Sequence, residues 1–339
     1  MSIQSEIDRL ALAKDDLADA ITSKGVAVPQ GGKLDSYPAL VLQIETGGGG
    51  GGNEPVPPST DGKTRLYITV PASAMEGEPP PRADVPLYIR QTVANGVSID
   101  WGDGSAAETL SGTGNVNTTH HYNAAGDYVI ALTVAEGCEL GLGWGTSSYC
   151  VMGSTSNSIS SNGASGYRTT LKMCSIGSGV TSIGSNAFRT CYGLSSVNIP
   201  DSVTSIGVNA FYNCYSLSSI NIPDSVTSIG ADAFSFCYSL SSVNISDSIT
   251  SIGSNTFGYC YSLFSVNIPD NVTSIGTYAF RACYSLKYVY FNSNTPPAIL
   301  SNTFGSIADD CIFSIPAGSL SAYQSATNFT GFTFEERAE

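Results

Sequence analysis

Between residues 176 and 295, the apolar positions of the chain recur at a fixed step of 23 residues. Five copies share three apolar positions, which are Ile183, Ile206, Ile229, Ile252 and Ile275, then Phe188, Phe211, Phe234, Phe257 and Phe280, then Leu194, Leu217, Leu240, Leu263 and Leu286. One unit of this length cannot bury its own apolar face, so the period predicts coils that stack and cover one another. The fold is therefore expected to be mainly β, with a solenoid over residues 176–295.

Each copy combines three short segments. Leu194, Val197 and Ile199 predict a strand with its apolar side chains inward, and the Pro-Asp pair that follows turns the chain. "VTSIG" predicts a second extended segment, and "NAFxxCY" predicts a compact helical turn that carries the buried phenylalanine. The repeated motif resembles the BspA-type leucine-rich repeats, which implies a bacterial or phage surface protein. The stretch that starts at "NTPPAIL" resembles the closing segment of such arrays and predicts a C-terminal cap over residues 296–339.

A cysteine and a tyrosine stand side by side in every copy, at Cys191, Cys214, Cys237, Cys260 and Cys283 and at Tyr192, Tyr215, Tyr238, Tyr261 and Tyr284. Equivalent side chains in a stack point the same way, so we expect reduced, buried cysteines that pack as small apolar residues. A metal site would need converging ligands, which the repeats lack. The tyrosine rings either cover the edge of the core or form an aromatic strip that contacts a ligand.

Positions that differ between copies indicate a recognition surface. The outward strand positions hold Ser or Asn in most copies and become large near the C-terminal end of the array. A second variable pair follows each phenylalanine: Arg189/Thr190, Tyr212/Asn213, Ser235/Phe236, Gly258/Tyr259 and Arg281/Ala282. Because packing fixes buried positions, both members of a pair are expected to face outward, although drift on an idle surface would look the same. The candidate receptor-binding residues are Tyr212, Phe236, Tyr259, Phe264, Arg281, Lys287, Tyr288 and Tyr290.

Residues 63–136 contain apolar runs of strand length, such as "RLYITV" and "DYVIALTV", and predict a β-sandwich. They also carry a W-G-D-G turn and a later H-x-Y, G-x-Y ending, formed by Trp101, Gly102, Asp103, Gly104, His120, His121, Tyr122, Gly126 and Tyr128. This motif pair resembles the PKD-type sandwich, which implies a spacer or a weak adhesion module. The two histidines are expected to support a turn. Residues 137–175, rich in Gly, Ser and Cys, are predicted to form an irregular N-terminal cap of the solenoid.

The first 46 residues predict a helix that forms a short coiled coil. Its seam alternates steps of four and three residues through Ile3, Ile7, Leu10, Lys14, Leu17 and Ile21, which favours a small homo-oligomer, taken here as a homotrimer. A helix folded back on "YPALVLQI" is the alternative. Residues 47–62 begin with six glycines and predict a flexible Gly/Pro linker. The opening "IDRLALAKDDLADAITSKGVAV" with "LDSYPALV" resembles the N-terminal segment of structural proteins in phages of Gram-positive hosts, which implies a virion anchor.

Composition narrows the possible functions. With 14 Lys and Arg against 28 Asp and Glu, the net charge is −14, which argues against nucleic acid and an anionic membrane as partners. No apolar run reaches the roughly 18 residues of a membrane span, and no signal-peptide pattern opens the chain. We find no catalytic motif, and predict no enzyme, cofactor or metal site. The acidic row Asp201, Asp224, Asp247 and Asp270 is expected to accept hydrogen bonds from turn backbone rather than to bind calcium.

Together these features predict a phage virion fibre or appendage. Its N-terminus would bind other virion proteins, and its solenoid would bind a glycan or protein on the host cell. It would be made in the host cytoplasm and lie on the exterior of the virion. The alternatives are a bacterial cell-surface adhesin, a virion decoration protein without a receptor and, less favoured, a polysaccharide depolymerase.

Overall fold

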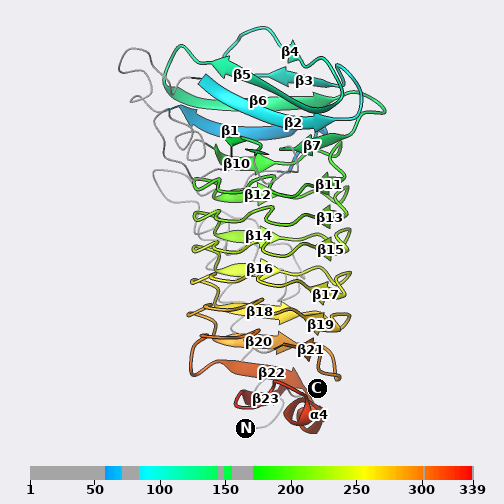
Figure 1. The fold of residues 1–339 in the computed structure, drawn as a ribbon, viewed down its shortest axis with the longest axis vertical. Helices are drawn as coiled ribbons and strands as arrows, with labels where there is room; N and C mark the ends of the chain where they lie inside the picture. Colours follow the sequence, from blue (N-terminus) through cyan, green and yellow to red (C-terminus); the bar gives the residue numbers. More distant parts are fainter. Residues whose placement is uncertain (1–57, 71–83, 144–148, 155–170, 301, 338–339) are drawn as a thin grey trace, which may run out of the picture. The chain divides into compact units, whose positions relative to one another are not determined.

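The computed structural model describes residues 58–70, 84–143, 149–154, 171–300 and 302–337 (Figure 1). The predicted coiled-coil helix and its seam, from Ile3 to Ile21, lie outside the described residues, as do the glycines of the linker. Among the described residues, no helix is long and apolar enough to cross a membrane. Strands dominate this part of the chain, and its one α-helix is the six-residue α4 (Leu320–Ser325).

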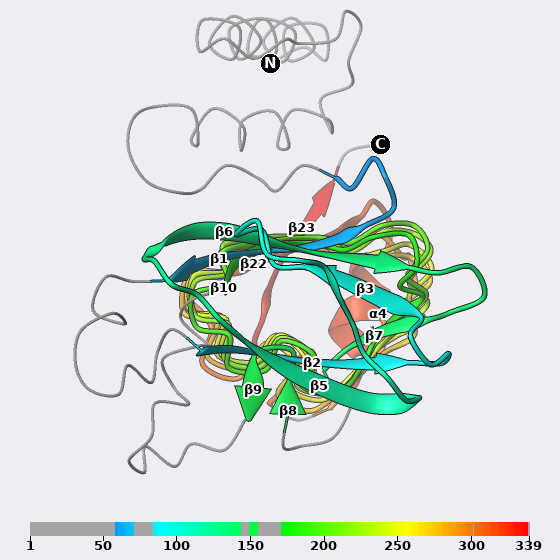
Figure 2. The ribbon, with the colours of Figure 1, turned by 90° about the horizontal axis from the view of Figure 1, so that it is seen from above.

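Two sheets form the predicted sandwich, and Figure 2 shows β1 and β6 on one side and β2 and β5 on the other. The larger sheet contains β1 (Thr64–Val70), β3 (Val97–Asp100), β4 (Glu108–Thr109) and β6 (Gly126–Val134). The smaller one has the order β5-β2-β7, from β2 (Asp84–Gln91), β5 (Gly114–His121) and β7 (Leu140–Leu142). Alternate residues of β1 and β2 point into the core, among them Leu66, Ile68 and Leu87. A sandwich is therefore present, whereas its PKD-type family stays a prediction.

The sandwich continues into the solenoid through β10 (Leu171–Ser175). Cys174 of β10 lies opposite Leu66 in an antiparallel pair with β1, and opposite Val197 in a parallel pair with β12. The segment expected to be an irregular cap also supplies β7 to the sandwich and the hairpin of β8 (Tyr149–Cys150) and β9 (Gly153–Ser154). The domain boundaries themselves stay predictions.

Two rows of short strands run along the solenoid (Figure 1). The first row is β12 (Ser196–Asn198), β14 (Ser219–Asn221), β16 (Ser242–Asn244), β18 (Ser265–Ile268), β20 (Tyr288–Phe291) and β22 (Ile312–Pro316). The second is β11 (Ser182–Ile183), β13 (Ser205–Ile206), β15 (Ser228–Ile229), β17 (Ser251–Ile252), β19 (Ser274–Ile275) and β21 (Ala298–Ile299). The second row consists of two parallel sheets, β11-β13-β15 and β17-β19-β21, with Ser205 opposite Ser228 in the first. The register confirms the period of 23 residues, and β23 (Thr333–Arg337) closes the first row beside β22.

A turn, and not the expected helical segment, forms the third side of each coil. Asn186 and Thr190 have φ values of 62° and 60°, and their equivalents in the other coils are also left-handed, which interrupts any helix. This conformation lets backbone amides of one coil reach carbonyls of the next. The amide of Phe188 donates to the carbonyl of Ala210, and the amide of Phe211 to that of Ala233, both at 2.7 Å. Backbone amides of the turn therefore find their hydrogen-bond acceptors in the neighbouring coil.

Phenylalanine rings fill the centre of the stack. Phe188, Phe211, Phe234, Phe257 and Phe280 are fully buried, and the centroids of successive rings lie 5.1 to 5.4 Å apart. Leu194, Val197 and Ile199 are buried as the strand pattern predicted. Each coil thus covers the apolar face of its neighbour, which confirms the solenoid.

Glycines let consecutive coils approach closely after the second-row strands. A Cβ atom on Gly207 would lie 2.4 Å from the backbone nitrogen of Ser185, and one on Gly230 would lie 2.5 Å from that of Val208. Any larger residue would push the coils apart. In the coils of Gly207 and Gly230, backbone contact between coils therefore explains the glycine of the "VTSIG" motif.

Candidate binding surface on the repeats

The tyrosine column lies along the edge where the turns lead into the first-row strands. Tyr192, Tyr215, Tyr238 and Tyr261 are partly buried, and Tyr284, at the end of the column, is 58% exposed. Successive ring centroids lie 4.6 to 5.2 Å apart, with interplanar angles of 5° to 29°. Burial raises the pKa of the Tyr215 and Tyr261 hydroxyls, and the adjacent tyrosines raise it further. The rings thus stack face to face, cover the edge of the core and leave hydroxyl groups on its surface.

In four of the five variable pairs after the phenylalanines, one residue is buried, contrary to the expectation that both face outward. Thr190, Ser235, Gly258 and Ala282 are buried, while Arg189, Phe236, Tyr259 and Arg281 are partly or fully exposed. Where the first residue of a pair is small, as in Ser235 and Gly258, the second is aromatic. In these four pairs, one small residue therefore fills the narrow space inside the turn while a large side chain reaches the surface. In the fifth pair, Tyr212 and Asn213 are both partly exposed. Variation inside the turn is possible because the residues there are all small.

The large members of these pairs contact one another along the stack. Tyr212 meets Phe236 edge to face, with centroids 5.3 Å apart, and Phe236 stacks on Tyr259 at 4.4 Å and 4°. Arginines close both ends: the guanidinium of Arg189 lies 5.0 Å from the centroid of Tyr212, and that of Arg281 lies 5.7 Å from that of Tyr259. Both distances fall within the range of cation–π attraction.

The two columns join into one surface. Phe236 meets Tyr238 edge to face at 6.2 Å, and Tyr259 meets Tyr261 in the same way at 6.4 Å. We call this surface the turn-edge strip, and it consists of Arg189, Tyr212, Phe236, Tyr259 and Arg281 together with Tyr192, Tyr215, Tyr238, Tyr261 and Tyr284. Four of these ten residues are among the receptor-binding candidates predicted from the sequence. Arg189 was not among them, although it stands at the position that Tyr212 and Arg281 occupy in other coils, and for the tyrosine column two interpretations were open.

The other four candidates form a separate group on the strands, here called the strand-face cluster: Phe264, Lys287, Tyr288 and Tyr290. Phe264 is 54% exposed and meets Tyr288 edge to face at 5.8 Å, and Tyr288 lies 5.9 Å from Tyr290. Lys287 forms an ion pair with Asp310, which lowers the pKa of that carboxyl group. The eight candidates are thus split between the turns and the first-row strands.

The cysteine column is structural, as predicted. All nine cysteines of the chain are buried, and none of them forms a disulfide bond. The thiol of Cys214 lies 3.2 Å from the carbonyl oxygen of Phe188 in the preceding coil, and that of Cys237 lies 3.3 Å from the carbonyl of Phe211. Burial raises the pKa of the Cys283 thiol to about 12. These thiols pack between coils as weak donors and carry no charge at neutral pH.

The acidic row does not supply the hydrogen bonds of its turns in the expected way. Asp201, Asp224, Asp247 and Asp270 are exposed. After Asp201 and Asp224, the next residue makes the bond instead, and in the Asp247 turn the preceding Ser246 donates to the carbonyl of Val226. The hydroxyl of Ser202 donates to the carbonyl of Val180 at 2.8 Å, and that of Ser225 to the carbonyl of Val203 at 2.7 Å. Within the described ranges, no group of three or more His, Cys, Asp or Glu residues could hold a metal ion.

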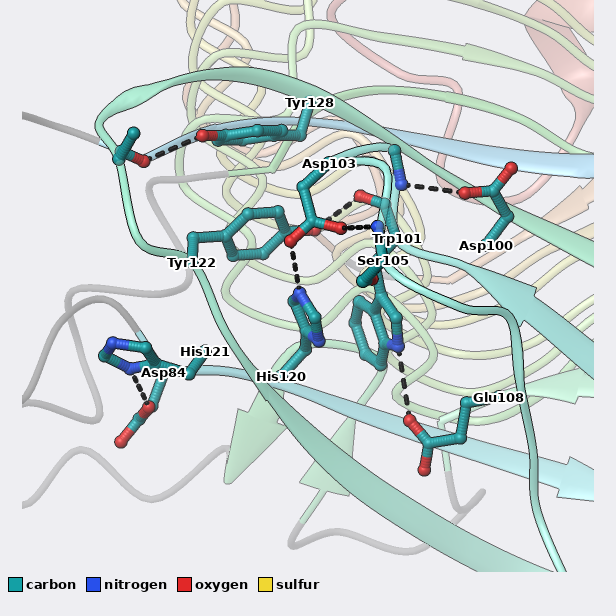
Figure 3. Close-up of polar contacts among 12 residues, drawn as sticks. Asp84, Asp100, Trp101, Asp103, Ser105, Glu108, His120, His121, Tyr122 and Tyr128 are labelled. Atoms are coloured by element: carbon teal, nitrogen blue, oxygen red, sulfur yellow. Dashed lines mark hydrogen bonds and ion pairs between the residues drawn. The ribbon is translucent and has the colours of Figure 1, made fainter.

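The histidine motif of the sandwich fixes a turn, as the sequence predicted (Figure 3). Nε2 of His120 lies 2.7 Å from Oδ2 of Asp103, and its ring stacks on Trp101 with centroids 4.6 Å apart. Hydrogen bonds from Ser105, and next the contact with His120, lower the pKa of Asp103 to about 2. His121, which was expected to support a turn as well, instead pairs through Nδ1 with Asp84 of the adjacent strand β2 at 2.7 Å.

The other polar groups of this motif are also occupied. The indole of Trp101 donates to Glu108 at 3.2 Å, and the hydroxyl of Tyr122 donates to the carbonyl of Trp101 at 2.8 Å. The amide of Gly102 donates to Asp100 at 3.0 Å. The contacts of His120 and Tyr122 link the β5 side to the turn after β3 in the other sheet, and together these bonds give the motif a structural role.

Comparison with known proteins assigns the repeats. Residues 159–287 match the BspA type Leucine rich repeat region in 6 copies, so this part of the chain is a BspA-type leucine-rich-repeat array. No curated protein matches the chain. The match covers the repeats and leaves the sandwich unassigned.

Three solved structures illustrate the likeness. A leucine-rich repeat protein from Eubacterium ventriosum is 22% identical over 39% of this chain and 42% of its own, with a TM-score of 0.35. The leucine-rich repeat protein of T. pallidum is 30% identical over 40% and 66%, with a TM-score of 0.33. A leucine rich cell surface protein from Faecalibacterium prausnitzii is 21% identical over 51% and 62%, with a TM-score of 0.24. This chain spans less than two thirds of each of them.

Proposed function

We propose that this chain is a non-enzymatic binding protein whose solenoid attaches it to a molecule on a cell surface. The observation that carries the proposal is the turn-edge strip, in which aromatic and arginine side chains of five successive coils meet outside the core. Tyr, Phe and Arg are enriched at the centres of binding interfaces. The outward positions of the first-row strands, by contrast, hold Ser or Asn in most coils. A surface of this composition favours recognition over catalysis.

Binding of the labelled full-length chain to intact bacteria tests this proposal. A panel of Gram-positive and Gram-negative cells is incubated with increasing amounts of fluorescent protein, and the unlabelled chain serves as competitor. We expect saturable binding to at least one strain, displaced by the unlabelled native chain but not by heat-unfolded chain. The absence of saturable binding on every strain would overturn the proposal, as would shortening of the cell-surface polysaccharide, which would indicate a depolymerase.

We propose that the protein is part of a phage virion appendage and is made in the host cytoplasm. The support is the resemblance of the first 46 residues to the N-terminal segment of phage structural proteins, which would bind other virion proteins and form the homotrimer. A bacterial cell-surface adhesin is the alternative. Immunogold electron microscopy separates the two, because label on particle appendages supports the virion and label on the bacterial surface contradicts it.

A further inference from the structure

The turn-edge strip exposes the edges of its aromatic rings rather than their faces. In the tyrosine column, Tyr215, Tyr238 and Tyr261 stack within 5° to 7° of parallel at 4.6 to 4.7 Å, so each ring covers the faces of its neighbours. Phe236 and Tyr259 do the same at 4.4 Å. Aromatic rings carry negative charge on their faces and positive charge at their edges. The strip therefore offers little area on which the C–H groups of a sugar could stack, and its ring edges attract carbonyls, carboxylates and other aromatic faces.

Positive charge reinforces this preference. Residues 176–295 contain three Lys or Arg residues, and two of them, Arg189 and Arg281, lie at the ends of the strip. The third, Lys287, is paired with Asp310. One acid, Asp232, lies near Arg189, and burial raises the pKa of its carboxyl group. Within the repeats, the two cationic side chains that form no salt bridge, Arg189 and Arg281, therefore both lie on the strip, although the chain as a whole has a net charge of −14.

The length of the strip defines the size of its partner. Arg189 and Arg281 are 92 residues apart, which is four steps of 23 residues. At a spacing of about 4.8 Å between coils, the two guanidinium groups are separated by about 19 Å along the stack. An extended peptide rises by about 3.3 Å per residue, so about six residues cover this distance.

We propose that the turn-edge strip binds an extended acidic protein segment that runs along the solenoid. Carboxylates near the ends of the segment contact Arg189 and Arg281, and apolar or aromatic side chains between them contact Phe236 and Tyr259. The inference rests on the proposed function and names its ligand class. Arginine forks bind carboxylates through two parallel hydrogen bonds, and Phe236, which has no polar group, requires an apolar side chain in the partner.

Fluorescence anisotropy with synthetic peptides tests the inference. The probe is a labelled octapeptide with two glutamates at each end and alternating valine and tyrosine between them, and the matched control peptide has glutamine in place of glutamate. The full-length chain is expected to bind the probe at least about fivefold more tightly than the control peptide, with a preference that weakens as salt increases. Hyaluronate and dextran, an anionic and a neutral polysaccharide, are measured as competitors.

Two pairs of substitutions locate the binding. Arg189→Ser with Arg281→Ser removes both cations of the strip, and Ser is the residue that another coil already carries there at Ser235. Lys172→Ser with Lys287→Ser removes the same charge elsewhere, and Ser195 stands at the position equivalent to Lys172 one coil later. We expect the first pair to abolish the preference for glutamate and the second to leave it within about twofold.

Three results would overturn the inference. The first is equal binding of the two peptides, and the second is equal loss in both pairs of variants. The third is displacement of the peptide by hyaluronate at similar concentration, which would make the strip a site for anionic polysaccharide. None of these results would contradict the proposed function, because saturable binding to cells is measured in a separate experiment.

Discussion

At the scale of single residues, backbone conformation explains which side chains the turns use. Asn186, Asn209, Asn255 and Asn302 occupy equivalent left-handed positions, with φ between 54° and 63°. Asn tolerates this region better than other residues with a Cβ atom, because its short side chain bonds locally. The left-handed backbone thus explains the asparagine of "NAF" in these coils, while Asp232 and Tyr278 adopt the same conformation in two others.

Asn255 provides a direct test, because substitutions there can separate backbone preference from side-chain contact. Asn255→Ala is expected to lower the free energy of unfolding by about 1 kcal/mol, the cost of an ordinary residue in the left-handed region. Asn255→Gly should stay close to the wild type, because glycine adopts this region freely. Urea unfolding measures both variants. Equal losses in the two would show that the amide side chain, and not the backbone, makes the contribution.

Asp103 makes the stability of the sandwich depend on acid. Its pKa is lowered to about 2 in the folded chain, against an ordinary value of 3.8, by Ser105 and His120. A lowered pKa stabilises the fold above the ordinary value, and this contribution is lost as the pH falls toward 2. Thermal unfolding between pH 5 and 2 should therefore show a steeper fall in Tm for the wild type than for Asp103→Asn. Parallel curves would contradict the role given to this carboxylate.

At the scale of elements, the repeat period could be predicted from the sequence and the surface could not. Apolar positions such as Phe211 and Leu217 fix the stack, because every coil must cover the next. The sequence does not predict which of Ser235 and Phe236 is buried in the turn. Both positions vary between coils, and a phenylalanine gives no indication that its φ is left-handed. The join through β10 was also not predicted. Leu171 and Ile176 do lie one period before Leu194 and Ile199, but Cys174 stands where the other copies carry Val or Ile.

Close backbone contact between coils gives a prediction for the strand-to-turn junction. A methyl group on Gly230 would meet the backbone nitrogen of Val208 at 2.5 Å, whereas on Gly253 it would first meet the Thr256 hydroxyl at 3.3 Å. Gly230→Ala is expected to cost about 2 to 3 kcal/mol of unfolding free energy, in the range of overpacked cores. Gly253→Ala, the matched control, should cost less than about 1 kcal/mol. A similar loss in both would mean that the coils do not approach as described.

At the scale of the whole molecule, the sandwich and the solenoid share one sheet through β1, β10 and β12. Repeat arrays gain stability from contacts between neighbours, and a coil at the end of an array has one neighbour fewer. Here the sandwich covers the first coil, and β22, α4 and β23 follow the last repeats. We therefore expect an internal coil to unfold only when the whole stack unfolds.

The buried thiols report this cooperativity. Cys214, Cys237 and Cys260 have no exposed surface, and burial raises the pKa of each. With a thiol-reactive chromophore at pH 8, the native chain should leave the five column cysteines unmodified, and all nine should react in denaturant. Mass spectrometry after partial labelling identifies the sites. Rapid labelling of internal coils would contradict a closed stack.

The most direct measurement compares binding to cells by two variants of the full-length chain. The strip variant combines Tyr212→Ser, Phe236→Asn and Tyr259→Asn, which are residue types that sister coils carry at Ser235 and Asn213. The strand-face variant combines Tyr288→Ser and Tyr290→Asn, which matches Ser265 and Asn267. With thermal unfolding unchanged in both, we predict at least a tenfold rise in Kd, about 1.4 kcal/mol, for the strip variant alone. Unchanged affinity of the strip variant, or an equal loss in the strand-face variant, would contradict the turn-edge strip as the binding surface.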